Sequence, residues 1–184
     1  MIAGLVLAAG AGERFGGSVK QLAPLRGRPL LEHALAAVLS LERVVVVLGA
    51  HADEIRAGVR MGGAEPIVCS DWASGQAASL RAGVAALSTC DALVVVLGDQ
   101  PLLSGDAVAR VVAARGSGAL AVRATYGGVP GHPVLIESSL FPALRALSGD
   151  VGARDVLRDA RVTDVPCDGL GDPGDVDAPT DLRP

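Results

Sequence analysis

The chain has 184 residues, which is enough for one substantial hydrophobic core, and half of its residues are hydrophobic. Its formal net charge of −4 argues against a nucleic-acid surface driven by bulk electrostatics, and no apolar run is long enough to span a bilayer. The three cysteines are widely separated and lack metal-site spacing, so we expect reduced thiols in a cytoplasmic protein.

Apolar runs alternate with helical patterns along most of the chain. Continuous Val and Leu runs, such as residues 44–48 and 93–97, indicate strands that are buried on both faces, as in a parallel sheet covered by helices. The alternation predicts a doubly wound α/β fold with a mostly parallel sheet, in a single domain over residues 1–184. We expect strands at residues 2–7, 44–48, 66–69, 93–97 and 119–123, and helices at residues 29–39, 53–60, 75–87 and 106–114.

The later part of the chain has a different composition. Residues 126–133 are rich in Gly and Pro, and we interpret them as a functional loop. The last twenty residues are rich in Asp, Gly and Pro, and we expect an irregular closing segment there.

The first expected strand runs into a loop of small residues that is followed by two basic side chains. The sequence reads Leu7-Ala8-Ala9-Gly10-Ala11-Gly12-Glu13-Arg14, with Lys20 six residues further on. Glycine lets several main-chain N–H groups converge on one anion, and Arg14 and Lys20 would add positive charge for a triphosphate. Phe15 stands where a dinucleotide motif needs Gly, and Ser18 stands where a Walker loop needs Lys. The alternative is a surface turn rich in small residues.

The expected strand at residues 93–97 ends in Gly98-Asp99. This places a carboxylate at the carboxyl edge of the sheet, where ligands bind in open α/β folds. A carboxylate there suits Mg²⁺, which commonly joins one or two carboxylates to substrate phosphates. Asp99 could instead cap a following helix, but Gln100-Pro101-Leu102 precede the expected helix start and make capping the less favoured reading.

A third element, residues 70–80, contains Asp71, Trp72, Gly75, Gln76 and Ser79. A helix that begins at Ser74–Gly75 would offer unpaired N–H groups and the positive end of its dipole to a ligand, with Ser79 one turn later. The alternative is a capped amphipathic helix with a buried Trp72.

Three further elements follow in the second half of the chain: Gly131-His132-Pro133, Gly149-Asp150-Val151-Gly152-Ala153-Arg154, and Asp175-Val176-Asp177-Ala178-Pro179-Thr180-Asp181-Leu182. The first could be a turn before a strand, the second a helix start, and the third a solvated acidic tail.

Together these elements resemble those of the nucleotidyltransferases that activate sugar phosphates and pterin cofactors. The loop of that family reads L-A-G/A-G, then Arg, an apolar residue, Gly and Lys, and here Leu7 to Gly10, Arg14, Phe15, Gly16 and Lys20 fill those places. The elements at residues 70–80, 131–133, 149–154 and 175–182 are similar to those of the branch of molybdenum cofactor cytidylyltransferases. Ala8-Ala9-Gly10 and Gly98-Asp99 favour CTP over the GTP of the guanylyl branch.

The resemblance implies transfer of CMP from CTP to the terminal phosphate of molybdopterin, with release of pyrophosphate. It implies a Rossmann-like sandwich in which residues 1–115 bind nucleotide and residues 116–184 bind the acceptor. Its partners would be CTP, a molybdopterin-type acceptor and a molybdoenzyme or its maturation chaperone, without nucleic acid or membrane. The implied residues are Arg14, Lys20 and Asp99 for catalysis; Leu7, Ala8, Ala9, Gly10, Gly12, Arg14, Lys20, Asp71, Gly75, Gln76 and Ser79 for the nucleotide; Asp99 and Asp177 for Mg²⁺; and His132 and Arg154 for the acceptor.

Three alternatives stay open. A guanylyltransferase or a sugar-phosphate nucleotidyltransferase would use the same loop and metal with another base or acceptor. A non-catalytic module could bind the nucleotide or deliver the cofactor. A dinucleotide-dependent oxidoreductase on a related sheet is disfavoured by the glycine spacing of the first loop.

Overall fold

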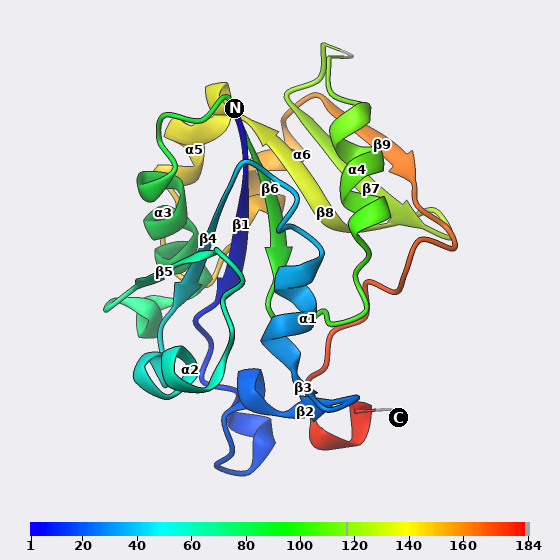
Figure 1. Ribbon diagram of the computed structural model, residues 1–184. Helices are drawn as coiled ribbons and strands as arrows, with labels where there is room; N and C mark the ends of the chain where they lie inside the picture. The colour runs from blue at the N-terminus through cyan, green and yellow to red at the C-terminus, as the bar shows by residue number, and fades with distance from the viewer. Residues whose placement is uncertain (117, 183–184) are drawn as a thin grey trace.

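The computed structural model describes residues 1–116 and 118–182 (Figure 1). Residues 117, 183 and 184, which the predicted single domain includes, lie outside the described residues. The strands are β1 (Ile2–Ala8), β2 (Pro24–Leu25), β3 (Arg28–Pro29), β4 (Arg43–Leu48), β5 (Glu65–Val68), β6 (Ala92–Leu97), β7 (Ala121–Tyr126), β8 (Val129–Glu137) and β9 (Val162–Pro166). The α-helices are α1 (Leu30–Ala36), α2 (Ala52–Gly58), α3 (Gln76–Ala86), α4 (Gly105–Ala113), α5 (Phe141–Arg145) and α6 (Ala153–Arg158).

One sheet of seven strands, in the order β5-β4-β1-β6-β8-β7-β9, forms the centre of the molecule. The pairs β5–β4, β4–β1, β1–β6 and β7–β9 are parallel, whereas β8 is antiparallel to both of its neighbours. The sheet is therefore mostly parallel, as predicted. Two adjacent strands, β1 and β6, end side by side, with Leu7 opposite Leu97.

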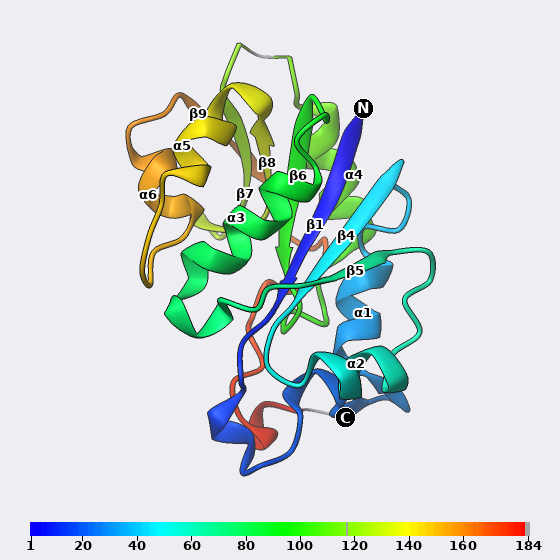
Figure 2. The same ribbon diagram turned by 90° about the vertical axis from the view of Figure 1, so that its left-hand side faces the viewer.

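Helices cover both faces of this sheet. Successive residues of β1 serve opposite faces: Leu5 packs in the cluster that includes residues of α3, α5 and α6, and Val6 in the cluster that includes residues of α1, α2 and α4. Figure 2 shows the same two layers, with α3, α5 and α6 on one side of the strands and α1, α2 and α4 on the other. The doubly wound α/β fold is thus confirmed. No helix in the described part of the chain is long and apolar enough to cross a bilayer.

The expected strands and helices are all present, with ends that differ by at most three residues. The loop expected at residues 126–133 is wrong, and their functional part stays a prediction. They form the end of β7, a tight turn at Gly127-Gly128 and the start of β8. The prolines of β8 misled the prediction, since proline cannot donate to a sheet ladder. They are tolerated because β8 pairs with β6 only from Val134 onward, so Pro130 and Pro133 precede that ladder.

The irregular segment after β9 returns to the carboxyl end of the parallel strands. It ends in a short 3₁₀ helix, Pro179–Asp181. Figures 1 and 2 both draw this red segment beside the blue segment that follows β1. The side chain of Val176 is buried there against Phe15, Leu25 and Leu30. The end of the described chain therefore becomes part of the edge at which β1 and β6 finish.

Gly49, directly after β4, allows three segments to meet at this edge. A Cβ atom at Gly49 would lie 2.6 Å from the carbonyl oxygen of Ala9 and 2.6 Å from the Cβ atom of Trp72. The amide of Ala50 donates a hydrogen bond of 3.1 Å to the same Ala9 oxygen. The first loop is therefore fixed against the end of β4 by a contact that leaves no room for a side chain.

We expect Gly49→Ala to lower the free energy of unfolding by about 1–3 kcal/mol, because the clash involves backbone and cannot be relieved by a rotamer change. Gly10→Ala is the matched control, in the loop that Gly49 contacts, since a Cβ atom there would meet nothing within 4 Å. The control should stay within about 0.5 kcal/mol of the wild type. Chemical denaturation of both variants makes the comparison, and equal stabilities would contradict this account of the loop.

Candidate active site

The loop after β1 is held in shape by its own glycines and by a buried amide. Gly12 has a φ of 64°, in the left-handed region that favours glycine, and the turn leads into the short 3₁₀ helix Glu13–Phe15. The Nε2 group of Gln21 donates to the carbonyl oxygens of Ala8, at 3.0 Å, and Gly10, at 3.1 Å. Gln21 thus braces the loop, a role that no spacing rule in the sequence indicates.

A cluster of four charged side chains lies beside this loop. The ammonium group of Lys20 is 2.8 Å from Asp99 Oδ2 and 3.4 Å from Asp177 Oδ1. The guanidinium of Arg14 is 3.0 Å from Asp177 Oδ2. Only 10% of the Lys20 side chain is exposed, and these carboxylates compensate the cost of burying its positive charge. The structure therefore brings together Arg14, Lys20, Asp99 and Asp177, which the sequence analysis selected from three separate elements.

The free oxygen of Asp99 offers a site for a divalent cation. Asp99 Oδ1 is buried and has no hydrogen-bond partner among the described residues. A buried carboxylate oxygen without a partner is costly, and a hard cation is a fitting ligand for it. Within the described chain no group of three or more His, Cys, Asp or Glu side chains is arranged to hold a metal ion. The donor set thus fits a cation that shares two carboxylates with substrate phosphates, rather than one held in an all-protein cage.

Two cavities meet at the ends of β1 and β6. The smaller, of about 70 Å³, lies between the first loop and the end of β6, and the larger, of about 660 Å³, extends from there toward β8 and α6. Leu7 lines both. The residues that line the smaller cavity are Leu7, Ala8, Gly10, Gly12, Lys20, Gln21, Gly98 and Asp99.

The larger cavity carries several charged and polar groups, most of which are already paired. Arg123 bonds to Asp164 at 2.9 Å, and Arg158 bonds to Asp155 at 2.6 Å. Arg154 also lines the cavity, and no carboxylate among the described residues lies within ion-pair distance of it. The guanidinium of Arg154 is therefore the positive charge that the cavity can offer to an anionic ligand.

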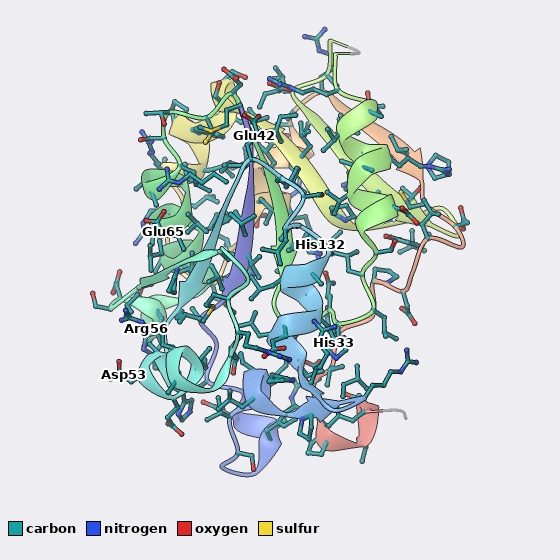
Figure 3. The ribbon with its side chains drawn as sticks, in the orientation of Figure 1. His33, Glu42, Asp53, Arg56, Glu65 and His132 are labelled. Carbon is teal, nitrogen blue, oxygen red and sulfur yellow. The ribbon has the colours of Figure 1, made fainter. Side chains whose placement is uncertain are left out.

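His132 lies on β8, next to β6 and toward the interior of the molecule (Figure 3). Burial lowers the pKa of His132 to about 4. The negative charge of Asp99 raises this pKa, and the positive charge of Arg154 lowers it further. The imidazole is therefore neutral near pH 7. His132 can give the larger cavity a hydrogen-bonding group but no positive charge, which limits its predicted part in holding an acceptor phosphate.

The start of α3, at which we expected unpaired N–H groups, is already in contact with another part of the chain. Its amides do not point freely at a ligand, because Ala77 donates to the carbonyl of Gly149 at 3.2 Å and Gln76 donates to Asp150 Oδ1 at 3.4 Å. A Cβ atom at Gly75 would lie 2.4 Å from that same carbonyl oxygen. The element at residues 149–154 thus occupies the helix start. No local pattern indicates this contact, because more than seventy residues separate its two sides.

The remaining predicted residues of this element are distributed differently. Gln76 lines the larger cavity, not the smaller. Asp71 is exposed and pairs with Arg81 at 3.4 Å, while Ser79 is buried. Neither Asp71 nor Ser79 lines either of the two cavities. Their nucleotide contacts stay predictions.

Two residues that the sequence analysis did not select also belong to this edge. Gln100 is buried, Asp175 is exposed, and both line the larger cavity. Burial and the charges of Asp99 and Asp177 raise the pKa of Asp175, although a hydrogen bond from Gln100 opposes this. Asp175 stands two positions before Asp177, and this alternation of acidic residues was a signal that could have identified Asp175.

The low pKa of His132 predicts a pH-dependent stability. Between pH 6.5 and pH 4 the unfolded chain takes up a proton at this histidine and the folded chain does not, so the free energy of unfolding should fall as the pH falls. We expect His132→Asn to remove this contribution, which is on the order of 1–2 kcal/mol by pH 5.

Denaturation of the wild type and His132→Asn at pH 7.5 and pH 5 measures the effect. His51→Asn is the control, because His51 is a surface residue with a φ of 58° that Asn tolerates. Parallel pH curves for the wild type and His132→Asn would contradict the assignment.

Comparison with known proteins agrees with this geometry. The chain is 39% identical over 167 residues to the nicotine blue oxidoreductase of Paenarthrobacter nicotinovorans, covering 85% of this chain and 81% of that protein. It is 31% identical over 175 residues to the purine catabolism protein PucB of Bacillus subtilis, covering 86% of this chain and 82% of PucB. It spans only 26% of the bifunctional protein GlmU of Mycobacterium sp. strain KMS, at 37% identity over 66% of this chain.

Among solved structures, Rv0371c from Mycobacterium tuberculosis H37Rv superimposes with a TM-score of 0.87 at 31% identity, covering 98% of this chain and 94% of that one. A second structure, of Rv0371c in complex with manganese, gives a TM-score of 0.82 at 28% identity and covers 98% of this chain and 95% of that one. Residues 4–165 match the MobA-like NTP transferase domain. The chain that carries the Lys20–Asp99–Asp177 cluster therefore belongs to the MobA-like NTP transferase family.

Proposed function

We propose that this chain transfers CMP from CTP to the phosphate of a molybdopterin-type acceptor and releases pyrophosphate. The observation that carries the proposal is the cluster of Lys20, Asp99, Asp177 and Arg14. It lies where a glycine-containing loop, a small cavity and a much larger cavity meet. This arrangement suits a triphosphate on one side and an acceptor on the other, with the reacting phosphorus between them.

The charges of the cluster can be redistributed when substrates bind. In the structure Lys20 and Arg14 neutralise Asp99 and Asp177. When a triphosphate enters, both basic groups can turn to its oxygens, and the carboxylates become available for a cation. Lys20 and Arg14 then stabilise the negative charge that builds up on the departing pyrophosphate. A divalent cation held by Asp99 and Asp177, Mg²⁺ in our proposal, would neutralise charge on the phosphates; manganese in the structure of Rv0371c supports such a site.

The acceptor side needs binding more than it needs a base. A phosphate monoester has a second pKa of about 6 and is largely ionised near neutral pH, so its oxygen can attack without a strong general base. Arg154 can hold that phosphate, because it lines the larger cavity and no carboxylate in the described part of the chain pairs with its guanidinium. His132 is neutral and can contribute only a hydrogen bond. Catalysis then depends on positioning and on charge neutralisation.

The choice of cytosine rests on two short sequences at this edge, Ala8-Ala9-Gly10 and Gly98-Asp99. Both line or adjoin the smaller cavity. They support CTP over GTP.

The name of one relative favours a second candidate, an oxidoreductase that uses a nicotinamide dinucleotide. The geometry supports it less well. Phe15 stands where the dinucleotide loop needs its third glycine. The residues directly after β4 are Gly49-Ala50-His51, without a carboxylate at the strand end to bind a ribose.

A nucleotide panel tests the proposed function. Purified protein is incubated with CTP, GTP, UTP or ATP and a divalent cation, with and without molybdopterin, and pyrophosphate release is measured. We expect release with CTP that depends on the acceptor. Release only with GTP would favour the guanylyl alternative, and oxidation of NADH or NADPH without any pyrophosphate release would favour the oxidoreductase.

Asp99→Ala is expected to reduce turnover by about 10³-fold or more, because Asp99 supplies the buried oxygen for the cation and a partner for Lys20. Its fold should remain intact, as measured by circular dichroism. Asp106→Ala, which removes an exposed carboxylate from the first turn of α4, is the control and should transfer CMP normally. Undiminished CMP transfer by Asp99→Ala would overturn the cation assignment.

A further inference from the structure

Residues 171–177, which we call the C-terminal strap, run beside the segment that follows β6. The amide of Asp172 donates to the carbonyl of Leu102 at 3.0 Å, and the amide of Val176 donates to the carbonyl of Asp99 at 2.9 Å. The two backbones run in opposite directions there. Both ends of the strap are therefore fixed to the segment that follows β6.

Gln100 holds the middle of the strap. Its Nε2 group donates to the carbonyl oxygen of Pro173 at 2.8 Å and to Asp175 Oδ1 at 2.8 Å. Both partners are acceptors only, so the amide can adopt just one orientation. The side chain is buried, with 4% of the residue exposed, and cannot exchange these bonds for water without moving. Gln100 thus uses both of its donors on the strap.

The position of Asp177 depends on this attachment. Asp177 is 53% exposed, so its ion pairs to the exposed Arg14, at 3.0 Å, and to the buried Lys20, at 3.4 Å, fix its side chain only weakly. The negative charges of Asp99 and Asp177 both act on Asp175 and oppose a second carboxylate at this place in the strap. The hydrogen bond from Gln100 to Asp175 opposes that repulsion two residues away from Asp177.

The strap would not detach completely without Gln100. The side chain of Val176 is buried among Phe15, Leu25 and Leu30, and its amide keeps the bond to Asp99. Loss of Gln100 should therefore loosen the strap without unfolding the sheet. This makes its contribution measurable in an intact protein.

We propose that Gln100 is a positioning residue: it holds the C-terminal strap so that Asp177 faces Asp99 and Lys20, and it acts on the cation site through the strap. The proposal rests on the proposed function, because nucleotidyl transfer is the reaction that this site would serve. It adds a residue that acts on the cation site through its hydrogen bonds to Asp175 and to the backbone of Pro173.

Gln100→Leu tests the proposal, since it keeps a similar volume and removes both donors. We expect hydrogen exchange at the amides of Val176 and Asp177 to become at least about tenfold faster. The dissociation constant for Mn²⁺, measured by electron paramagnetic resonance of the free ion, should rise about tenfold. In the transfer reaction the concentration of metal needed for half-maximal rate should rise, while the KM for CTP changes little.

Two further variants separate positioning from a general loss of structure. Arg110→Met removes a bond of the same kind, from a side chain to the carbonyl of Pro166, outside the strap. It should leave exchange in the strap and Mn²⁺ binding unchanged. Asp175→Asn keeps an acceptor for Gln100 and should keep the exchange protection that Gln100→Leu loses.

Unchanged exchange at Val176 and Asp177 in Gln100→Leu would overturn the proposal, as would faster exchange with unaltered Mn²⁺ affinity. A wild-type protein that binds no Mn²⁺ would overturn it too. The wild type could also bind Mn²⁺, and Gln100→Leu could weaken that binding, while the wild type releases pyrophosphate from no nucleotide. That result would count against the proposed function alone.

Discussion

The buried ammonium group of Lys20 needs carboxylates around it, and the two that it finds come from distant parts of the chain. Asp99 follows β6, and Asp177 lies on the strap that follows β9. A lysine that is nine-tenths buried is costly unless it is paired. Asp99 is the nearer partner, at 2.8 Å, and Asp177 of the strap lies 3.4 Å away. The candidate site is therefore arranged around this ammonium group, where the end of β6 and the strap meet.

The two cavities differ in what they offer a ligand: the smaller one offers charge and the larger one mainly shape. The smaller one is lined by the first loop and by the charged pair Lys20 and Asp99, and it suits phosphates. The larger one has the paired Arg123 and Arg158, a neutral imidazole at His132, and Arg154, whose guanidinium has no carboxylate partner among residues 1–116 and 118–182. A ligand in the larger cavity therefore has to be recognised mainly by hydrogen bonds and surface complementarity, with charge needed at a single point.

The sequence was sufficient for the parallel half of the fold because its signals are local. A continuous apolar strand such as β6 and a small-residue loop such as residues 8–12 can be recognised from neighbouring residues alone. The strand β8 could not, since Pro130 and Pro133 are tolerated only because of where the neighbouring ladder begins. The roles of Gln21 and Gln100 also escaped prediction, because each depends on backbone carbonyls that only the folded chain brings near.

The resemblance to a family located the four charged residues but could not reveal how they are supported. Arg14, Lys20, Asp99 and Asp177 carry motif patterns, whereas the groups that orient them are an amide and backbone carbonyls without a pattern of their own. The contacts at the start of α3 also lack a sequence pattern, since Gly149 and Asp150 lie near this helix only in the folded chain. Long-range contacts between polar groups were therefore the main part of the site that sequence reasoning could not supply.

The single reversed strand, β8, has a consequence for how this scaffold can diversify. Because β8 runs against its neighbours, its beginning and not its end faces the larger cavity, and it is joined to β7 by a short turn at Gly127-Gly128. The hairpin of β7 and β8 can therefore change its residues without disturbing the loops that follow β1 and β6. Substitutions in the hairpin would change the wall of the larger cavity while the edge that carries Lys20 and Asp99 stays the same.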